Sequence, residues 1–430
     1  MSPGLPVEPA PAKPAAPRIW RPMILWTAAI LAALGVAWFI GAVAVPVWQT
    51  RAAVQAVYDK LSPWYEVGGI GVDSQRTSER QAAVERLGGP DLAARRLGFY
   101  LMLPEWTDSK RRLIPILDHG SREEAYKILG FCGRSGLPPL VRSLGDPRSG
   151  WRFEAARALG NIGPAAGEAV PELAKVLNDG DRLLRWAATL ALGQIGPAAQ
   201  PAVPALIRLA GADTLPDVRA EACESLGIIG NLSAVQVLTK ALTDNAEEVR
   251  SRAAEALGRL GPEAEGAVPA LALALQDADP HTRARVAQAL ACMAPRVKAA
   301  VPALSRALSD DDAYVRWAAA DALGGAGPDA APAVPYLAKA LKHEDSKTRW
   351  MAAQALGQIG EASLEAVPAL IEALGDHQCA DDAARALGRI GPKAKVSIPA
   401  LEKCVSQGEK SLRAAAAEAL TKIRREEPSK

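Results

Sequence analysis

The stretch Val301 to Ala333 reads VPALSRALSDDDAYVRWAAADALGGAGPDAAPA, and related stretches fill the chain from residue 137 onward. Its opening apolar residue, in most copies followed by proline, recurs at intervals of 31 to 33 residues. The copies begin at Leu137, Val170, Val203, Val235, Val268, Val301, Val334, Val367 and Ile398. A repeat of this length indicates a solenoid, in which each unit buries its apolar face against its neighbours. Such a chain displays a long surface, which favours binding over catalysis.

Each unit is predicted to contain two helices. In the unit from residue 170 to 202, Pro171 suits the first turn of a short helix, and Leu173, Val176 and Leu177 form its apolar stripe. A second helix is expected from about Arg182 to Ile195, ended by the pair Gly196-Pro197. No strand pattern competes, so the predicted fold is all-α.

An arginine stands seven residues before the leucine of each second helix, near the packed side of that helix. These arginines are Arg152, Arg185, Arg219, Arg250, Arg283, Arg316, Arg349 and, in the last unit, Arg413. We expect a structural ladder between units, in preference to a row of ligand-binding cations, because a buried lone charge is costly. The expected partners, in the preceding turns, are Asp146, Asp181, Asp217, Asp279 and Asp312. Ala380 interrupts the series, and a local irregularity is expected there.

The quoted stretch and its eight relatives resemble HEAT repeats of the PBS-lyase HEAT-like type. This resemblance covers about two-thirds of the chain and implies an α-solenoid whose second helices line the concave, partner-binding side. It says less about function, because the superfamily includes scaffolds, adaptors, transport factors and a few enzymes. Residues 137–423 are assigned to the repeats, and residues 78–136 to degenerate N-terminal capping repeats with a less apolar outer face.

A second feature is the run from Met23 to Trp48, which contains 26 residues without a charge. As a helix it reaches about 39 Å, enough to span a hydrocarbon core of about 30 Å. An uncleaved transmembrane anchor over residues 23–48 is favoured over a cleaved signal peptide or a buried helix, because the run is long and precedes the repeats. Three cations before the run and two after it place the N-terminus in the cytoplasm and the repeats outside.

The remaining segments are short. Residues 1–22 are rich in proline and alanine and are expected to form a disordered tail. Residues 49–77 are assigned to a juxtamembrane helix and linker, and residues 424–430 to a C-terminal tail.

Composition argues against several kinds of site. The net charge is +2 with both signs interspersed, so no basic stripe for nucleic acid is predicted. The five cysteines lie far apart and the four histidines fall in different units, so no metal site, cofactor or catalytic residue is assigned. Cys132, Cys379 and Cys404 occupy predicted core positions, which suits inert buried thiols. A multi-histidine iron site and a phosphate-binding loop are both disfavoured.

Aromatic residues follow the ladder arginine in four units, at Phe153, Trp186, Trp317 and Trp350. Two interpretations stay open: the rings pack against the neighbouring unit, or they anchor a bound protein, since tryptophan is frequent in interface hot spots. Trp317 and Trp350 are adjacent in the stack and form the centre of the second interpretation.

The sequence therefore predicts a membrane-anchored HEAT-repeat scaffold or adaptor that binds a protein partner and has no catalysis of its own. An accessory or enzyme subunit resembling a bilin or chromophore lyase is the first alternative, and a structural cell-envelope protein is the second.

Overall fold

The computed structural model describes residues 72–101 and 119–424, together with Thr50, Ala52 and Ala56. All the regular elements in these ranges are helices, and the chain divides into two compact units, residues 1–128 and 129–430. The predicted anchor at 23–48, the tail at 1–22 and the C-terminal residues 425–430 lie outside the described residues. None of the described helices is both long and apolar enough to cross a membrane.

The smaller unit contains helices α3 (Val72–Arg86) and α4 (Pro90–Leu101), and α5 (His119–Gly130) begins within it. A two-bond ion pair joins α3 to α5, because Arg80 Nε lies 2.6 Å and Arg80 Nη2 lies 3.3 Å from the two carboxylate oxygens of Glu124. The Glu124 carboxylate is almost fully buried, so this pair fixes the two helices together.

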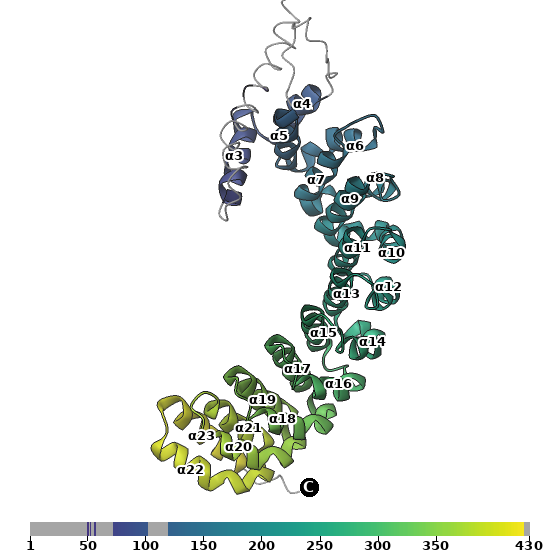
Figure 1. Ribbon diagram of the computed structural model, residues 1–430. Helices are drawn as coiled ribbons and strands as arrows, with labels where there is room; N and C mark the ends of the chain where they lie inside the picture. The colour runs from purple at the N-terminus through teal and green to yellow at the C-terminus, as the bar shows by residue number, and fades with distance from the viewer. Residues whose placement is uncertain (1–49, 51, 53–55, 57–71, 102–118, 425–430) are drawn as a thin grey trace, which may run out of the picture. The chain divides into compact units, whose positions relative to one another are not determined.

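The larger unit is a stack of helix pairs. The first helices are α6 (Leu137–Gly145), α8 (Val170–Val176), α10 (Val203–Ala212), α12 (Val235–Ala241), α14 (Val268–Ala274), α16 (Val301–Ala307), α18 (Val334–Ala340), α20 (Val367–Ala373) and α22 (Ile398–Gln407). The second helices are α7 (Arg152–Ile162), α9 (Arg182–Ile195), α11 (Pro216–Ile229), α13 (Glu247–Leu260), α15 (Pro280–Met293), α17 (Ala313–Gly325), α19 (Ser346–Ile359), α21 (Ala380–Ile390) and α23 (Lys410–Ile423). Within this unit the second helices line the inner side of a curved array and the first helices line the outer side (Figure 1).

The predicted helix pairs are confirmed, and the bounds of α9 agree with those read from the sequence. A short 3-10 helix between the end of each second helix and the next first helix was not predicted. These segments are Gly133–Gly136, Gly163–Ala169, Gly196–Ala202, Leu232–Ala234, Gly261–Ala267, Lys298–Ala300, Gly327–Ala333, Gly360–Ala366 and Gly391–Ser397. In the five segments that begin with glycine and proline, the proline starts the tight turn instead of only ending the helix before it.

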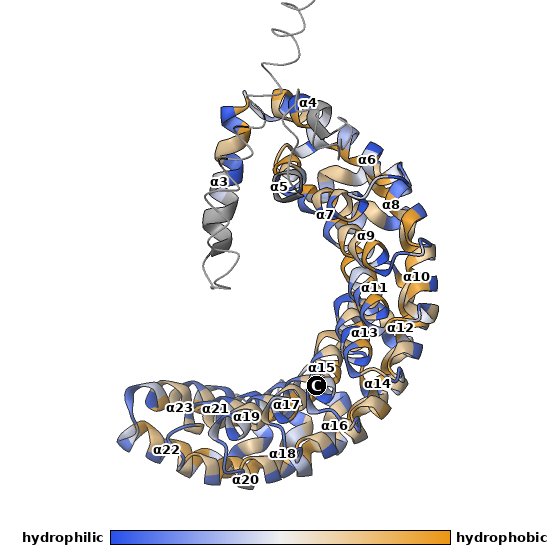
Figure 2. Ribbon diagram, turned by 45° about the horizontal axis from the view of Figure 1, so that its top comes forward, coloured by the Kyte–Doolittle hydropathy of each residue, from blue (hydrophilic) through white to orange (hydrophobic). Residues whose placement is uncertain are grey.

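Hydrophobic and hydrophilic residues alternate along both helix layers (Figure 2). The core between the layers consists mainly of alanine, leucine and valine, with the leucine of each second helix fully buried, as at Leu257 and Leu323. Consecutive second helices approach closely at glycine. A Cβ atom added to Gly258 would lie 2.9 Å from the Cα atom of Ala289, too close for any other residue without a shift.

The irregularity expected at Ala380 is present. Helix α21 has 11 residues where α19 has 14, and it starts at Ala380 itself. Cys379, which precedes it, donates no side-chain cap to the helix start, whereas Asp345 caps α19.

Candidate protein-binding surface

Four consecutive second helices carry an arginine that binds the loop of the following unit. Each arginine donates through Nε and Nη2 to both carboxylate oxygens of one aspartate, at 2.6 to 3.1 Å. The pairs are Arg185–Asp213, Arg219–Asp244, Arg250–Asp277 and Arg283–Asp310. Two parallel bonds between a guanidinium and a carboxylate are among the strongest polar contacts in proteins. We call these four pairs the arginine ladder.

Each ladder arginine also binds its own unit. The Nη1 atom of Arg250 donates to the main-chain carbonyl of Asp244 at 2.9 Å, and Arg283 donates in the same way to Asp277. An aspartate such as Asp277 therefore accepts from one arginine with its carboxylate and from the next with its carbonyl. The hydrogen bond from Arg219 is the main cause that lowers the pKa of Asp244 below its ordinary value.

The expected aspartate partners were wrong. Asp181, Asp279 and Asp312 accept main-chain N–H groups at the starts of α9, α15 and α17 instead. Asp146 pairs with Arg148, and Asp217 lies in the first turn of α11. Each ladder arginine binds an aspartate of the following unit, whereas we had predicted an aspartate of its own unit.

The two ends of the series are weaker. Arg152 makes one bond to Asp179 at 2.7 Å, and Arg349 bonds to Asp376 at 2.5 Å and to Gln378 at 3.1 Å. Arg413, on the last described helix, is exposed and has no ion pair among the described residues. Arg182, outside the register, is exposed as expected.

The step from α17 to α19 departs from the ladder. His343 occupies the position that Asp310 holds one unit earlier, so Arg316 has no carboxylate there. Arg316 instead bonds to Thr348 Oγ1 at 3.2 Å and lies 3.7 Å from Asp345. Only 8% of Arg316 is exposed, which makes it a buried arginine with a weak partner.

The carboxylate of Asp345 accepts hydrogen bonds from two neighbouring side chains. The indole N–H of Trp317 donates to Asp345 Oδ2 at 2.8 Å, and Thr348 Oγ1 donates to the same oxygen at 2.6 Å. Burial by itself would raise the pKa of Asp345, but the hydrogen bonds from Thr348, Trp317 and the N–H of Lys347 outweigh it and hold the pKa far below the ordinary value. Trp317 thus belongs to the polar link between α17 and α19.

The ring of Trp317 is fixed from two sides. The Lys347 ammonium lies 3.7 Å from the ring centroid, and the Tyr314 ring meets it edge-on with centroids 5.0 Å apart. Cation–π and edge-to-face contacts of this kind each add about 0.5 to 1.5 kcal/mol. These two contacts hold the Trp317 ring in one orientation.

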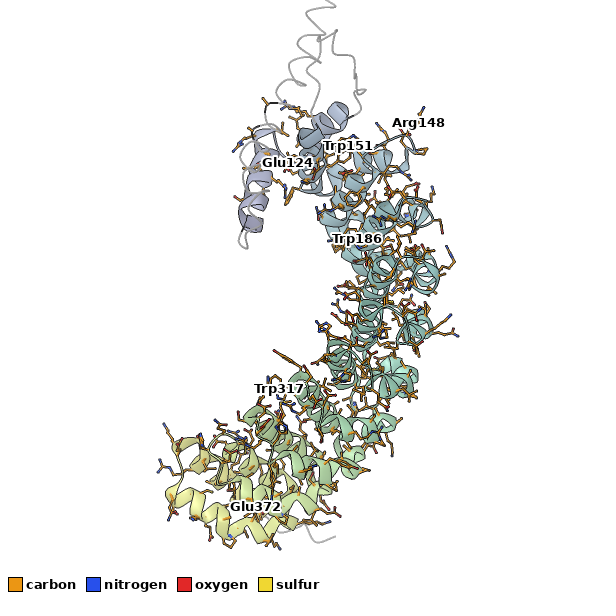
Figure 3. The ribbon with its side chains drawn as sticks, in the orientation of Figure 1. Glu124, Arg148, Trp151, Trp186, Trp317 and Glu372 are labelled. Atoms are coloured by element: carbon orange, nitrogen blue, oxygen red, sulfur yellow. The ribbon has the colours of Figure 1, made fainter. Side chains whose placement is uncertain are left out.

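Only two of the four predicted aromatic residues lie together. Trp317 and Trp350 line one groove across α15, α17 and α19, and Trp350 is 36% exposed. Trp186 is half-buried on α9, and Phe153 on α7 lies 5.7 Å from the guanidinium carbon of Arg157. Trp186 and Trp317 both lie along the inner side of the array (Figure 3), but several units separate them.

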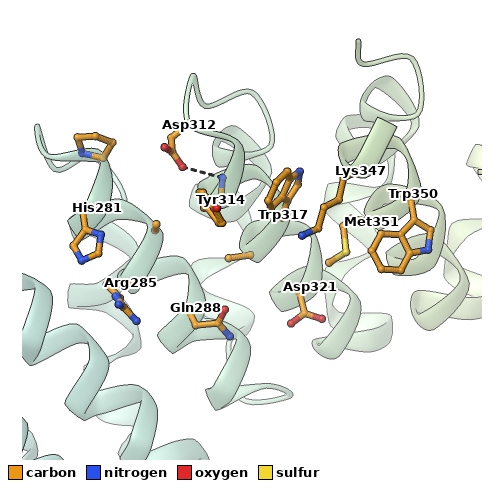
Figure 4. Close-up of a pocket in the computed structure, with 13 residues that line it drawn as sticks. His281, Arg285, Gln288, Asp312, Tyr314, Trp317, Asp321, Lys347, Trp350 and Met351 are labelled. Carbon is orange, nitrogen blue, oxygen red and sulfur yellow. Dashed lines mark hydrogen bonds between the residues drawn. The ribbon is translucent and has the colours of Figure 1, made fainter. Parts of the chain in front are cut away.

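The groove has a volume of about 810 Å³ and a mixed lining (Figure 4). Three helices supply its lining. These residues are Pro280, His281, Ala284, Arg285 and Gln288 from α15; Asp312, which caps α17; Tyr314, Trp317, Ala318 and Asp321 from α17; and Lys347, Trp350 and Met351 from α19. Tyr314 is 67% exposed, so the aromatic surface continues outward from Trp317. Sequence reasoning missed Tyr314, Lys347 and the polar side of α15.

A sequence signal does mark this place. The close-contact glycine of the second helices is replaced in α15 by Ala291, which faces the position of Ala322 in the next unit. A methyl group therefore stands where most other second helices have only a hydrogen atom. The glycine-proline stop is also missing after α15.

Much of the charge on the inner helices is already paired. Arg252 binds Glu224 at 2.6 Å and Glu248 at 2.8 Å, and Arg259 binds Glu255 at 2.7 Å. Beside Glu224, burial raises the pKa of Glu221 to about 7, and the neighbouring carboxylate adds to the effect. These pairs leave α11 and α13 less available to a charged ligand than the groove.

The thiols do not form a site. Cys132, Cys223 and Cys379 are buried, and burial raises the pKa of Cys132 and Cys223 to about 12. Cys404, expected in the core, is half-buried on α22, the last first helix of the described residues. Within the described residues no cluster of histidine, cysteine, aspartate or glutamate is arranged to hold a metal ion.

Comparison with solved structures places this fold among known helical arrays. An engineered protein is 27% identical with a TM-score of 0.54, over 77% of this chain and 99% of that one. Importin β is 16% identical with a TM-score of 0.55, over 86% of this chain and 55% of its own length. Kap95p, in a complex with RanGDP, is 15% identical with a TM-score of 0.54, over 88% of this chain and 55% of that one. No curated protein matches.

The family is shown by the sequence itself. A model of HEAT repeats matches residues 137–214, 170–258, 203–291, 236–309, 268–334 and 301–382, which together cover more than half of the chain. The helix pairs, their period and the solved relatives agree with this match. The chain therefore belongs to the HEAT-repeat proteins.

Proposed function

We propose that this protein is a membrane-anchored HEAT-repeat scaffold that binds a protein partner at the groove of α15, α17 and α19. The observation that carries the proposal is the exposure of Tyr314 and Trp350 beside the fixed ring of Trp317. Exposed aromatic side chains grouped on a rigid surface are typical of interface hot spots.

The ladder arginines are not the binding groups in this proposal, because their donors are already used within the array. The four ladder arginines donate hydrogen bonds to aspartates and carbonyls of the array. They are Arg185, Arg219, Arg250 and Arg283. They are structural groups in this proposal, and the ligand-binding groups are the groove residues. Kap95p, whose binding induces the switch loops of RanGDP to adopt the GTP-bound conformation, gives a protein partner for an array of this fold.

The anchor is the part of the proposal that rests on sequence alone. Residues 23–48 form an uncharged run of membrane-spanning length, and the PBS-lyase type of repeat is proposed on the resemblance of residues 301–333. We expect the full chain to resist alkaline carbonate extraction from membranes. A chain that lacks residues 23–48 should be released, and retention of that variant would contradict the anchor.

Site-specific crosslinking tests the binding surface. A photoreactive phenylalanine analogue at Tyr314, in the groove, should crosslink one stoichiometric partner in the full chain. The matched control is the same analogue at Tyr336, an exposed tyrosine on outer helix α18. Equal crosslinking from both positions, or none from Tyr314, would contradict binding at the groove.

A further inference from the structure

We propose that the groove of α15, α17 and α19 binds a proline-rich segment of the partner, in the polyproline II conformation and with a basic residue beside the prolines. This inference rests on the proposed function, because it specifies the partner of the same surface. Four observations support it: the spacing of the rings, the indole N–H of Trp350, the donors on α15 and the carboxylate of Asp321.

The spacing of the rings selects the ligand's conformation. Trp317 and Trp350 stand 33 residues apart at equivalent positions of α17 and α19, and they lie on neighbouring helices in Figure 4. Packed helices are about 8 to 10 Å apart. A polyproline II helix has three residues per turn and repeats every 9 Å or so, about the same distance. A bound α-helix would reach both rings only through residues seven positions apart, at about 10 Å, whereas polyproline II reaches them through consecutive turns.

The two tryptophans differ in what they offer a ligand. The indole N–H of Trp317 is taken by Asp345, so this ring can only present a face or edge. The indole N–H of Trp350 has no hydrogen bond to any described residue, and the ring is exposed. A half-exposed tryptophan with a free N–H packs against a proline ring and donates to a neighbouring carbonyl.

The opposite wall supplies further donors. Polyproline II has no internal hydrogen bonds, so the carbonyl groups of a bound segment need partners from the groove. Arg285 and Gln288 point from α15 toward this space, and Arg285 is held only loosely, at 3.8 Å from Glu255. An entirely apolar groove would leave the carbonyls unpaired.

Charge complementarity predicts a basic residue in the bound segment. The Asp321 carboxylate lines the groove between the two tryptophan-bearing helices, is exposed, and forms no ion pair with any described residue. Asp312 is occupied at the start of α17, and Lys347 lies over the Trp317 ring. Asp321 is thus a carboxylate of the groove that has no ion pair among the described residues, and a lysine or arginine next to the prolines complements it.

A synthetic peptide provides the probe. Residues 3–18 of this chain, PGLPVEPAPAKPAAPR, carry prolines three residues apart at Pro3, Pro6 and Pro9 and again at Pro11, Pro14 and Pro17, with a lysine between them. We expect the fluorescein-labelled peptide to bind the full-length protein in detergent, as measured by fluorescence anisotropy. The same peptide with every proline changed to alanine should bind at least tenfold more weakly.

Matched variants locate the binding. Trp350→Ala and Tyr314→Ala should each weaken peptide binding at least tenfold, because both remove exposed rings from the groove. Asp321→Asn should weaken it about threefold to tenfold, and this loss should vanish for a peptide with Lys13 changed to alanine. Trp186→Ala, at the equivalent position of α9, should leave binding unchanged within twofold and so controls for general loss of structure.

Specific results would overturn the inference. Equal binding of the proline and alanine peptides, or unchanged binding by both Trp350→Ala and Tyr314→Ala, would exclude a polyproline ligand here. A tenfold rise in peptide affinity when residues 1–22 are removed would assign the groove to the chain's own segment and overturn the assignment to a partner. If crosslinking from Tyr314 persists while no proline peptide binds, this inference fails and the proposed function stands.

Discussion

The contact between α13 and α15 and the contact between α17 and α19 use the same arginine position in different ways. In the first, Arg250 makes two short bonds to Asp277 of the next unit. In the second, His343 replaces the aspartate, and the nearest carboxylate of Arg316, Asp345, accepts from Trp317. The comparison shows that where the repeat lacks its aspartate, the two helices are linked through Trp317 and Thr348 instead.

The largest effect is expected from breaking a regular step. Arg283→Met removes both bonds to Asp310 and leaves that carboxylate without its cation, which should lower the free energy of unfolding by about 2 to 4 kcal/mol. Denaturant unfolding of the purified protein in detergent measures the change. Arg182→Met, at an exposed position, is the control and should cost less than about 0.5 kcal/mol. Equal costs at the two sites would remove the structural role of the ladder.

In the contact between α17 and α19, stability should depend on the Trp317 ring instead of on the arginine. Trp317→Ala removes a half-buried side chain and a donor to Asp345, so we expect a loss of about 2 kcal/mol. Trp350→Ala, on an exposed ring, should cost less than about 1 kcal/mol. Unfolding of the two variants under the same conditions separates the roles, and a larger cost at Trp350 would reverse our assignment of the two tryptophans.

Acid should weaken a step with an arginine–aspartate pair. The hydrogen bond from Arg349 is the main cause that lowers the pKa of Asp376 from 3.8 to about 2. A lowered pKa means that the pair stabilises the fold above about pH 4 and that this contribution is lost as the pH falls toward 2. Asp376→Asn should therefore cost about 1 kcal/mol at pH 7 and almost nothing near pH 2. A pH-independent cost would show that charge is not the source.

The smallest effect should come from repairing the exceptional step. His343→Asp restores the carboxylate that Arg316 lacks, and it keeps the acceptor for the Asp345 N–H, since Asp310 serves Asp312 in the same way. We expect a gain of about 0.5 to 1 kcal/mol in unfolding free energy. A loss of stability would mean that the histidine ring is needed for packing at this step.

The helix pairs could be predicted because period, proline and glycine signals act locally, as at Gly196-Pro197. The ladder partners could not, because the link from Arg250 to Asp277 spans 27 residues and depends on how the units stack. The groove was missed, although Ala291 on one of its helices departs from the repeat pattern. A departure from the repeat pattern can predict a groove only when the structural role of each repeat position is already known.

The dual role of each ladder aspartate bears on how such a chain changes length. A whole unit contributes one arginine directed forward and one aspartate directed backward, as Arg250 and Asp244 do for the unit that begins at Val235. Recombination that duplicates or excises one complete unit therefore keeps donors and acceptors equal in number and creates no orphan ion. Two units are exceptions, since the unit that begins at Val334 has His343 in place of the acid and the unit that begins at Val367 has Ala380 in place of the arginine. Gene-level copying of the unit that begins at Val334 would multiply the weak step.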